Sequence, residues 1–221
     1  MLIKRPQILV INPNSNQEVT KVIAKELQSF NFSDGPEIVC EDLPEGPFGI
    51  ESQADIESVI LPLRNIVSER IDIDAFVIAC YSDPGLQVCR EATDRPVFGI
   101  QECGVLAAMA QGNRFGVIAL QEDSIRRHLI YLNQMGVIGR FANERAANLS
   151  VDECATGTKI FEKICTVSHQ LRDEDQADTI ILGCAGMTSH RSRLESKIGI
   201  PVIDPVKAAL SMAMHTLISK I

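Results

Sequence analysis

The sequence lacks the features that would place this protein in a membrane, outside the cell or on a nucleic acid. It contains no apolar run near the roughly 18 residues that a membrane-spanning helix needs. Residues 1–6 lead into a short apolar strand, without the hydrophobic region or cleavage site of a signal peptide. Basic residues are in deficit, with 21 Lys and Arg against 29 Asp and Glu. We therefore expect a cytoplasmic protein that binds neither membranes nor nucleic acids.

Metal and disulfide sites are also missing from the pattern. The seven cysteines are odd in number and include no CxxC pair, and the four histidines have no metal-type spacing. No lysine stands in a recognisable site for pyridoxal phosphate. We expect reduced thiols, most of them small buried hydrophobic residues, and neither a zinc site nor a pyridoxal phosphate site. The cysteines are Cys40, Cys80, Cys89, Cys103, Cys154, Cys165 and Cys184.

What the sequence does have is an alternation of short apolar segments with amphipathic ones. Residues 7–11 and 75–79 predict strands, and the second is apolar throughout, as in a strand covered on both faces. Residues 19–30 and 55–70 predict helices, with Pro62 as a kink or boundary in the second. With 45% hydrophobic residues, this alternation predicts an α/β protein with largely parallel sheets.

Two distant segments repeat one pattern. Asp74 stands six residues before Cys80 with an apolar strand between them, and Asp178 stands in the same relation to Cys184. A Pro-Val pair follows the first cysteine after 16 residues and the second after 17. This repetition predicts two similar α/β lobes, each with a cysteine at the carboxyl end of a central strand. We assign residues 1–104 to the first lobe and 105–207 to the second.

The matched cysteines fall where ligands bind in open α/β sheets, at the carboxyl end of a strand. Each also begins a turn into a helix, whose N-terminus lowers the pKa of a thiol from about 8.5. Either cysteine alone is more simply a buried structural thiol, but the symmetric pair favours function. A thiolate on one side of a carbon and a thiol on the other can invert a stereocentre without a cofactor. Backbone N–H groups after both cysteines would then stabilise the enolate.

Motifs across almost the whole chain carry a further indication. They are residues 10–15 (VINPNS), 46–52 (GPFGIES), 79–86 (ACYSDPGL), 90–91 (RE), 96–100 (PVFGI), 182–187 (LGCAGM) and 201–204 (PVID). This set resembles the aspartate/glutamate/hydantoin racemase superfamily, most closely its hydantoin and allantoin racemase branch. The resemblance implies two pseudo-symmetric lobes, each a mainly parallel sheet flanked by helices, with the active site in the cleft between them. It implies Cys80 and Cys184 as catalytic acid/bases and no metal or cofactor. It also implies a C-terminal helix, 208–221, that joins the first lobe, and a homo-oligomer.

The resemblance also implies a set of substrate-binding residues in four loops. For Asn14 and Asn16, turn and helix-cap chemistry is an equal alternative, and for the loop around Pro47 and Phe48 a plain surface turn is nearly so. Three positions depart from the family: Ser82 replaces a usual glycine, and Ala119 and Leu120 replace usual threonines. The full set is Asn14, Asn16, Pro47, Phe48, Tyr81, Ser82, Ala185, Gly186 and Met187. The basic run 126–128 predicts a solvated helix face.

These observations predict a cofactor-independent racemase that acts on a small 5-substituted hydantoin or allantoin. Alternatives on the same scaffold are racemisation of an amino acid of the aspartate or glutamate type, another isomerisation, or decarboxylation. A non-catalytic protein that binds a small molecule is the alternative from another class. A cysteine hydrolase that pairs Cys184 with His190 is a more remote one.

Overall fold

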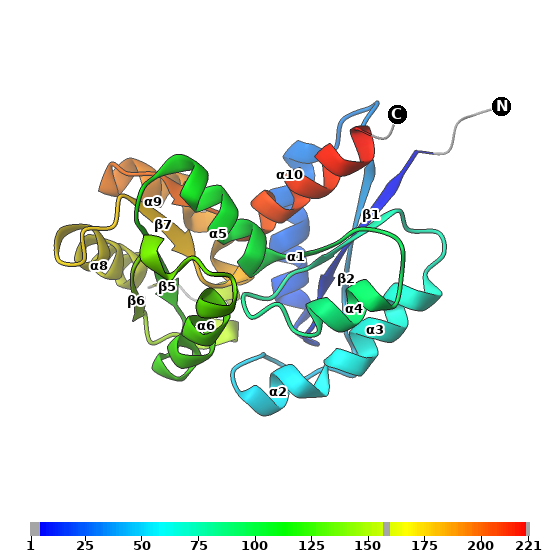
Figure 1. Cartoon of the computed structure of the whole chain (residues 1–221), viewed down its shortest axis with the longest axis horizontal. Coiled ribbons are helices and arrows are strands. Elements are labelled where there is room, and N and C mark those ends of the chain that lie inside the picture. Colours follow the sequence, from blue (N-terminus) through cyan, green and yellow to red (C-terminus); the bar gives the residue numbers. More distant parts are fainter. Residues whose placement is uncertain (1–4, 157–159, 220–221) are drawn as a thin grey trace.

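The computed structural model describes residues 5–156 and 160–219, which form two lobes, each built on a four-stranded parallel sheet (Figure 1). The first sheet has the strand order β2-β1-β3-β4 and the second has the equivalent order β6-β5-β7-β8. The predicted fold of two similar α/β lobes is therefore confirmed. The strands are β1 (Gln7–Asn12), β2 (Glu37–Asp42), β3 (Ala75–Ile78), β4 (Val97–Gly99), β5 (Phe115–Ala119), β6 (Phe141–Ala146), β7 (Thr179–Leu182) and β8 (Val202–Ile203).

Helices flank both sheets (Figure 1). The α-helices are α1 (Gln17–Leu27), α2 (Gln53–Ser58), α3 (Ile60–Glu69), α4 (Leu86–Glu91), α5 (Ile100–Gln111), α6 (Glu122–Gln134), α7 (Val151–Thr156), α8 (Ile160–Asp173), α9 (Arg191–Ile198) and α10 (Pro205–Ile218). Three short 3-10 helices are η1 (Gln28–Phe30), η2 (Ile138–Arg140) and η3 (Ala185–His190).

The repeated acidic residues hold the central strands in place. The carboxylate of Asp74 accepts a hydrogen bond from the backbone nitrogen of Gln7 at 2.8 Å, at the start of β1. Asp178 accepts two such bonds at 2.9 Å, from Asn113 and Arg114, just before β5. The same residue type at the same offset thus performs the same structural task in both lobes.

The repeated Pro-Val pair has a similar explanation. The carbonyl oxygen of Pro96 accepts a hydrogen bond from the nitrogen of Phe76 in β3 at 3.0 Å. Pro201 accepts the corresponding bond from Ile180 in β7, also at 3.0 Å. Because proline has no N–H, it suits the residue just before these short fourth strands, where its carbonyl alone is needed.

The single helix predicted over residues 55–70 is two helices, α2 and α3, that meet at Val59. Pro62 is the cause, because its ring lacks an N–H and clashes with the carbonyl four residues earlier, at Ser58. The backbone hydrogen bonds of α2 therefore end at Ser58. Pro62 lies in the first turn of α3, where a residue without an N–H is tolerated.

Two helices are exchanged between the lobes. Helix α5 follows the last strand of the first sheet but packs against β5, β7 and β8 of the second. Helix α10 follows the last strand of the second sheet but packs against β1, β3 and β4 of the first (Figure 1). The two helices also pack against each other, and a Cβ added at Gly104 would lie 2.9 Å from Pro205 Cβ. Glycine at 104 permits this close approach.

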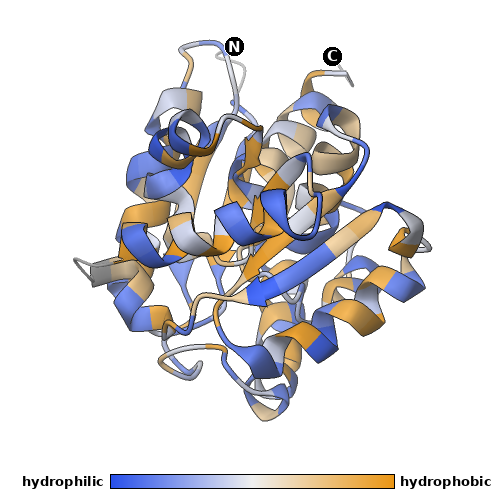
Figure 2. Ribbon diagram, turned by 90° about the vertical axis from the view of Figure 1, so that its left-hand side faces the viewer, coloured by the Kyte–Doolittle hydropathy of each residue, from blue (hydrophilic) through white to orange (hydrophobic). Residues whose placement is uncertain are grey.

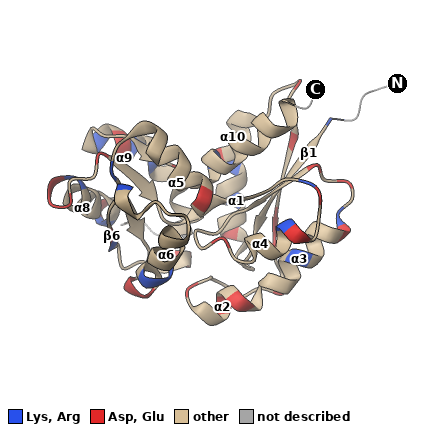
Figure 3. Cartoon of the chain, in the orientation of Figure 1, with Lys and Arg blue, Asp and Glu red and all other residues tan. Residues whose placement is uncertain are grey.

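The interior is apolar and the outside is mixed in charge. Figure 2 shows predominantly hydrophobic strands inside helices that carry both hydrophobic and hydrophilic residues. Figure 3 shows acidic and basic residues interspersed over the outer helices and loops of both lobes. Within residues 5–156 and 160–219, no helix is long and apolar enough to cross a membrane. The same residues contain no group of three or more His, Cys, Asp or Glu that could hold a metal ion.

Candidate active site

A cavity lies between the lobes, at the carboxyl ends of the central strands. Residues that follow β1, β3, β5 and β7 line it, together with side chains of α1, α6 and α7. Cys80 and Cys184 both border this one cavity. Its lining consists of Asn14, Val19, Ile50, Glu51, Ala79, Cys80, Tyr81, Ser82, Leu120, Gln121, Ser124, Arg127, His128, Val151, Gly183, Cys184 and Ala185.

The Cys184 thiol is surrounded by hydrogen-bond donors. It caps the start of η3, where its Sγ accepts from the backbone nitrogen of Gly186 at 3.3 Å. A hydrogen bond from Cys154 and backbone bonds from Gly186 and Met187 together lower the pKa of Cys184, against the effect of burial. Cys184 is therefore the thiol better suited to exist as a thiolate.

Cys154 is the partner that sequence analysis did not single out. It lies on α7, is 2% exposed, and its thiol donates to Cys184, which raises its own pKa far above the ordinary value. A Cβ added at Gly186 would approach Cys154 Cβ to 3.2 Å and Cys184 Sγ to 3.6 Å. Glycine at 186 therefore leaves the space in which the two sulfurs meet. Nothing in the local sequence around Cys154 indicates this contact.

Cys80 has the opposite environment. Burial, followed by the proximity of Cys184, raises its pKa to about 12, although part of the residue is accessible from the cavity. A hydrogen bond from the Ser82 backbone and the positive charge of Arg127 act in the other direction. Cys80 is therefore the protonated member of the pair.

The two asparagines of the first loop separate in role. Asn14 lines the cavity, and its Oδ1 accepts from Asn12 Nδ2 at 2.9 Å and from the nitrogen of Asn16 at 3.0 Å. Its amide nitrogen is thus the atom that can donate to a ligand. Asn16 does not line the cavity. Its side chain caps α1 by accepting a hydrogen bond from the nitrogen of Glu18 at 3.1 Å, so the alternative role of helix cap applies to this residue.

The loop around residue 48 lies differently from the prediction. Pro47 and Phe48 are not part of the cavity lining, and Phe48 is 61% exposed. The loop is turned because the carbonyl of Pro47 accepts from the nitrogen of Ser15 at 3.0 Å. Its next residues, Ile50 and Glu51, line the cavity instead.

Tyr81 and Ser82 line the cavity beside a histidine that the sequence did not predict there. His128 is 3% exposed, so the prediction of a solvated face at residues 126–128 is wrong for this residue. Its Nε2 lies 3.2 Å from Ser82 Oγ, its Nδ1 lies 2.6 Å from Glu144 Oε1, and its ring meets the Tyr81 ring edge-on. The overlooked signal is spacing, because Ser124, His128 and Leu132 recur every four residues on the buried face of α6.

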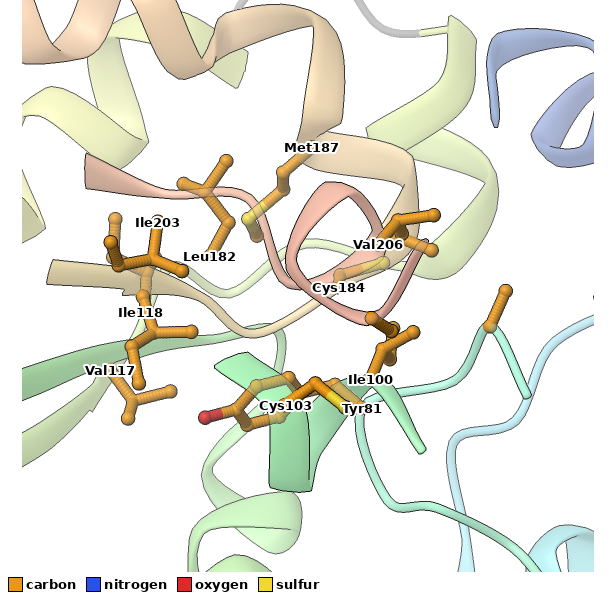
Figure 4. Close-up of a cluster of buried hydrophobic side chains, with 14 of the residues drawn as sticks. Tyr81, Ile100, Cys103, Val117, Ile118, Leu182, Cys184, Met187, Ile203 and Val206 are labelled. Atoms are coloured by element: carbon orange, nitrogen blue, oxygen red, sulfur yellow. The ribbon is translucent and has the colours of Figure 1, made fainter. Parts of the chain in front are cut away.

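The residues after Cys184 divide between the cavity and the core. Ala185 lines the cavity, whereas Gly186 and Met187 do not. Met187 is fully buried and points toward Leu182 in the apolar core of the second lobe (Figure 4). The backbone nitrogens of Gly186 and Met187 hold the Cys184 sulfur, rather than facing a substrate as expected.

His190, the residue required for a cysteine hydrolase, is outside the cavity lining. Its ring lies 6.2 Å from that of Phe161, and burial followed by the charge of Arg193 lowers its pKa. The arrangement gives Cys184 a thiol donor, Cys154, in place of a histidine base.

Comparison with known proteins gives consistent results. A family model described as Asp/Glu/Hydantoin racemase matches residues 8–213. The chain is 36% identical to a hydantoin racemase of Paenarthrobacter aurescens, over 94% of this chain and 89% of that protein. It is 35% identical to a hydantoin racemase of Pseudomonas sp. (strain NS671), over 94% and 84% respectively. The solved allantoin racemase of Klebsiella pneumoniae superposes with a TM-score of 0.90 at 30% identity, covering 97% of this chain and 88% of that one.

Proposed function

The chain belongs to the Asp/Glu/hydantoin racemase family, and from that premise we propose that it is a racemase in which Cys80 and Cys184 act as the two acid/bases. The substrate we propose is a 5-substituted hydantoin or allantoin, in keeping with the activities named for its relatives. The observation that carries the proposal is that both thiols, from equivalent strand ends, border one cavity.

The two pKa directions support one order of proton transfer in this proposal. The Cys184 thiolate removes the proton from the carbon beside the ring carbonyl, so the C–H bond breaks and an S–H bond forms. The Cys80 thiol then gives its proton to the opposite face of the carbon, which forms a new C–H bond and leaves a thiolate. The product is the other enantiomer, and the two cysteines have exchanged protonation states.

The intermediate between these steps carries negative charge on the ring oxygen. Two cavity residues can stabilise it: the Asn14 amide nitrogen by a hydrogen bond and the Arg127 guanidinium by its charge. Arg127 is fixed by hydrogen bonds to the carbonyls of Asp123 at 2.9 Å and Glu51 at 3.1 Å. These residues take the role that sequence analysis gave to the backbone N–H groups after the cysteines.

The remaining walls suit a compact ring better than a free dicarboxylic amino acid. Val19, Leu120, Val151 and Ala185 are apolar, so they cannot hold two carboxylates in place. Decarboxylation needs one cysteine as acid, whereas here both thiols border the cavity. Tyr81, Ser82 and Ala185 contact the ring or its substituent in this proposal.

The test is to incubate the protein with single enantiomers of 5-substituted hydantoins, allantoin, aspartate and glutamate in deuterium oxide. We expect loss of optical rotation together with incorporation of deuterium at the stereocentre for the hydantoins. Racemisation confined to amino acids would reject the proposed substrate. Absence of both rotation loss and exchange for every compound would instead indicate a binding protein.

A further inference from the structure

A second cavity adjoins the proposed active site, and its lining combines polar side chains with Ile56 and Ile130. Ser82, Arg127 and His128 line both cavities, so the two cavities meet at these residues. The second cavity, here called the side cavity, is also bordered by Gln101 of α5 and by Tyr131 and Gln134 of α6. Figure 1 shows α6 beside the loop that follows β3, where these elements meet.

Gln101 is the unusual residue of the side cavity. It is 1% exposed, yet neither Oε1 nor Nε2 of its side chain finds a hydrogen-bond partner within the described part of the chain. A buried amide without hydrogen-bond partners has lost its contacts with water and gained none in return, so this arrangement disfavours folding. The terminal torsion of glutamine is broad, so its amide can turn toward a ligand without a rotamer penalty.

The position of Gln101 is firmly set by the backbone. The Asp83 carboxylate accepts from the nitrogens of Gln101 at 2.9 Å and Glu102 at 2.8 Å, which fixes the start of α5 against the loop that carries Cys80. Tyr131 Oη lies 3.4 Å from the carboxylates of Asp83 and Glu102. The unpaired amide is therefore on a rigid element beside the catalytic loop.

The wall shared by the two cavities presents a second polar group in a fixed orientation. Ser82 Oγ lies 3.2 Å from His128 Nε2, and His128 Nδ1 lies 2.6 Å from Glu144 Oε1, so this chain of contacts holds the hydroxyl in place. A hydroxyl oxygen has two lone pairs, so at least one remains for an N–H donor. Glu144 Oε2 is itself without a partner among the described residues, so the His128–Glu144 pair is buried at a cost.

We propose that the side cavity is a subsite for a carboxamide or urea group on the substituent of the substrate, bound by Gln101 and Ser82. A planar amide offers one carbonyl and two N–H groups. Gln101 can donate to the carbonyl and accept from one N–H, while Ser82 Oγ accepts from the other. This inference rests on the proposed function, because it requires the ring to lie between Cys80 and Cys184.

Two hydantoins of nearly the same shape test the subsite. 5-(Carbamoylmethyl)hydantoin and 5-isobutylhydantoin differ only in that a planar amide replaces two methyl groups. We expect kcat/KM for racemisation of the first to exceed that of the second by at least about 100-fold, because a site built to hydrogen-bond a group rejects an analogue that lacks it. Equal rates, or preference for the isobutyl compound, would overturn the inference.

The variant Gln101→Leu separates recognition from folding. It keeps the size of the side chain and removes an amide that has no partner, so the variant should melt no lower than the wild type. We expect kcat/KM for the carbamoylmethyl compound to fall about 10- to 100-fold while that for the isobutyl compound rises. The matched control is Gln111→Leu, the same change at the exposed end of the same helix, which should leave the ratio of the two substrates unchanged.

Binding measured by calorimetry separates this inference from the proposed function. If neither hydantoin is racemised or exchanges deuterium, the proposed function fails, but tighter binding of the carbamoylmethyl compound that Gln101→Leu removes would still support the subsite. Equal binding of the two compounds, or an unchanged preference in Gln101→Leu, overturns the subsite alone. The comparison of the two substrates on the wild type decides the matter even if the variant does not fold.

Discussion

The two lobes place a cysteine at the same point of the same topology, yet they surround it differently. Cys184 receives hydrogen bonds from Cys154 and two backbone nitrogens, and its pKa is lowered. Cys80 lies in a buried position beside Cys184, and its pKa is raised to about 12. The equivalent backbone topology of the two lobes thus places both sulfurs at one cavity. The different groups around each sulfur shift the two pKa values in opposite directions. In the mechanism proposed above, this asymmetry makes Cys184 the base and Cys80 the acid of the resting state.

The largest effect should come from removing either sulfur. Cys80→Ser and Cys184→Ser should each lower racemisation by several orders of magnitude, because a hydroxyl is a far weaker acid than a thiol. Cys80→Ser should still exchange the proton of one enantiomer with deuterium oxide, because the Cys184 thiolate remains. Cys184→Ser should exchange that of the opposite enantiomer, and more slowly, because burial keeps the Cys80 thiol protonated. NMR follows the exchange and polarimetry follows the inversion.

The control for that pair is Cys165→Ser, a half-buried cysteine on α8 outside the cavity lining. It should racemise at the wild-type rate. Full activity in either Cys80→Ser or Cys184→Ser would show that the replaced thiol is not one of the two acid/bases.

A smaller effect should follow from making the two environments alike. Cys154→Ala removes the thiol that donates to Cys184, so the pKa of Cys184 should rise and less thiolate should exist at neutral pH. Hydrogen bonds to charged groups are worth about 1.5–3 kcal/mol, so we expect a loss of kcat/KM at pH 7 of about 10- to 100-fold. The acid limb of the pH profile should move to higher pH, and activity should recover toward the wild-type value as the pH rises.

Cys89→Ala is the matched control for Cys154→Ala. Cys89 is fully buried among apolar side chains of the first lobe and does not line the cavity. Its replacement should therefore cost stability but leave the pH profile unchanged. A pH profile of Cys154→Ala identical to that of the wild type would show that Cys154 does not lower the pKa of Cys184.

A few-fold effect should come from the residue two positions beyond each cysteine. Ser82 and Gly186 occupy this equivalent place, so Ser82→Gly makes the first lobe resemble the second. We expect a few-fold loss of kcat/KM for substrates with an amide substituent and a smaller change for alkyl substituents, since one neutral hydrogen bond is worth about 1 kcal/mol. Steady-state kinetics with the two matched hydantoins measure the difference, and equal losses for both would contradict it.

The smallest effect concerns the strand-holding carboxylates, and it should appear in stability only. Asp178 accepts two backbone hydrogen bonds and Asp74 accepts one. Asp178→Asn should therefore lower the free energy of unfolding by about 1 kcal/mol, and Asp74→Asn by less. Urea unfolding provides the measurement, with racemisation at the wild-type rate in both variants. A larger loss for Asp74→Asn would mean that the lobes are not held equivalently.

The sequence was sufficient to predict features that depend on residues close together in the chain. The alternation of strands and helices, the repeated Asp-strand-Cys pattern and the strand-end position of Cys80 and Cys184 all depend on neighbours within a few residues. The polar groups around the cavity depend on tertiary contacts instead. Cys154 meets Cys184 across 30 residues, and His128 meets Ser82 across 46. No local spacing encodes such distances.

The loop at residues 47–48 is the opposite case, because Pro47 and Phe48 were predicted to bind substrate but do not line the cavity. Its motif is part of the family resemblance, but the direction in which the loop points is set by one hydrogen bond, from the nitrogen of Ser15 to the carbonyl of Pro47. That bond turns Phe48 outward and brings Glu51 inward, where its Oε1 accepts from the nitrogen of Val151 in the second lobe at 2.9 Å.

The exchange of α5 and α10 has a consequence for the order of synthesis. The strands of the first sheet leave the ribosome early, but the helix that covers β1, β3 and β4 is encoded after every other element. The lobe that is made first is therefore completed last, and until then it exposes an apolar sheet face of the kind that chaperones bind. An arrest of translation just before residue 205 would leave both lobes translated, with the face of the first sheet that α10 covers still exposed.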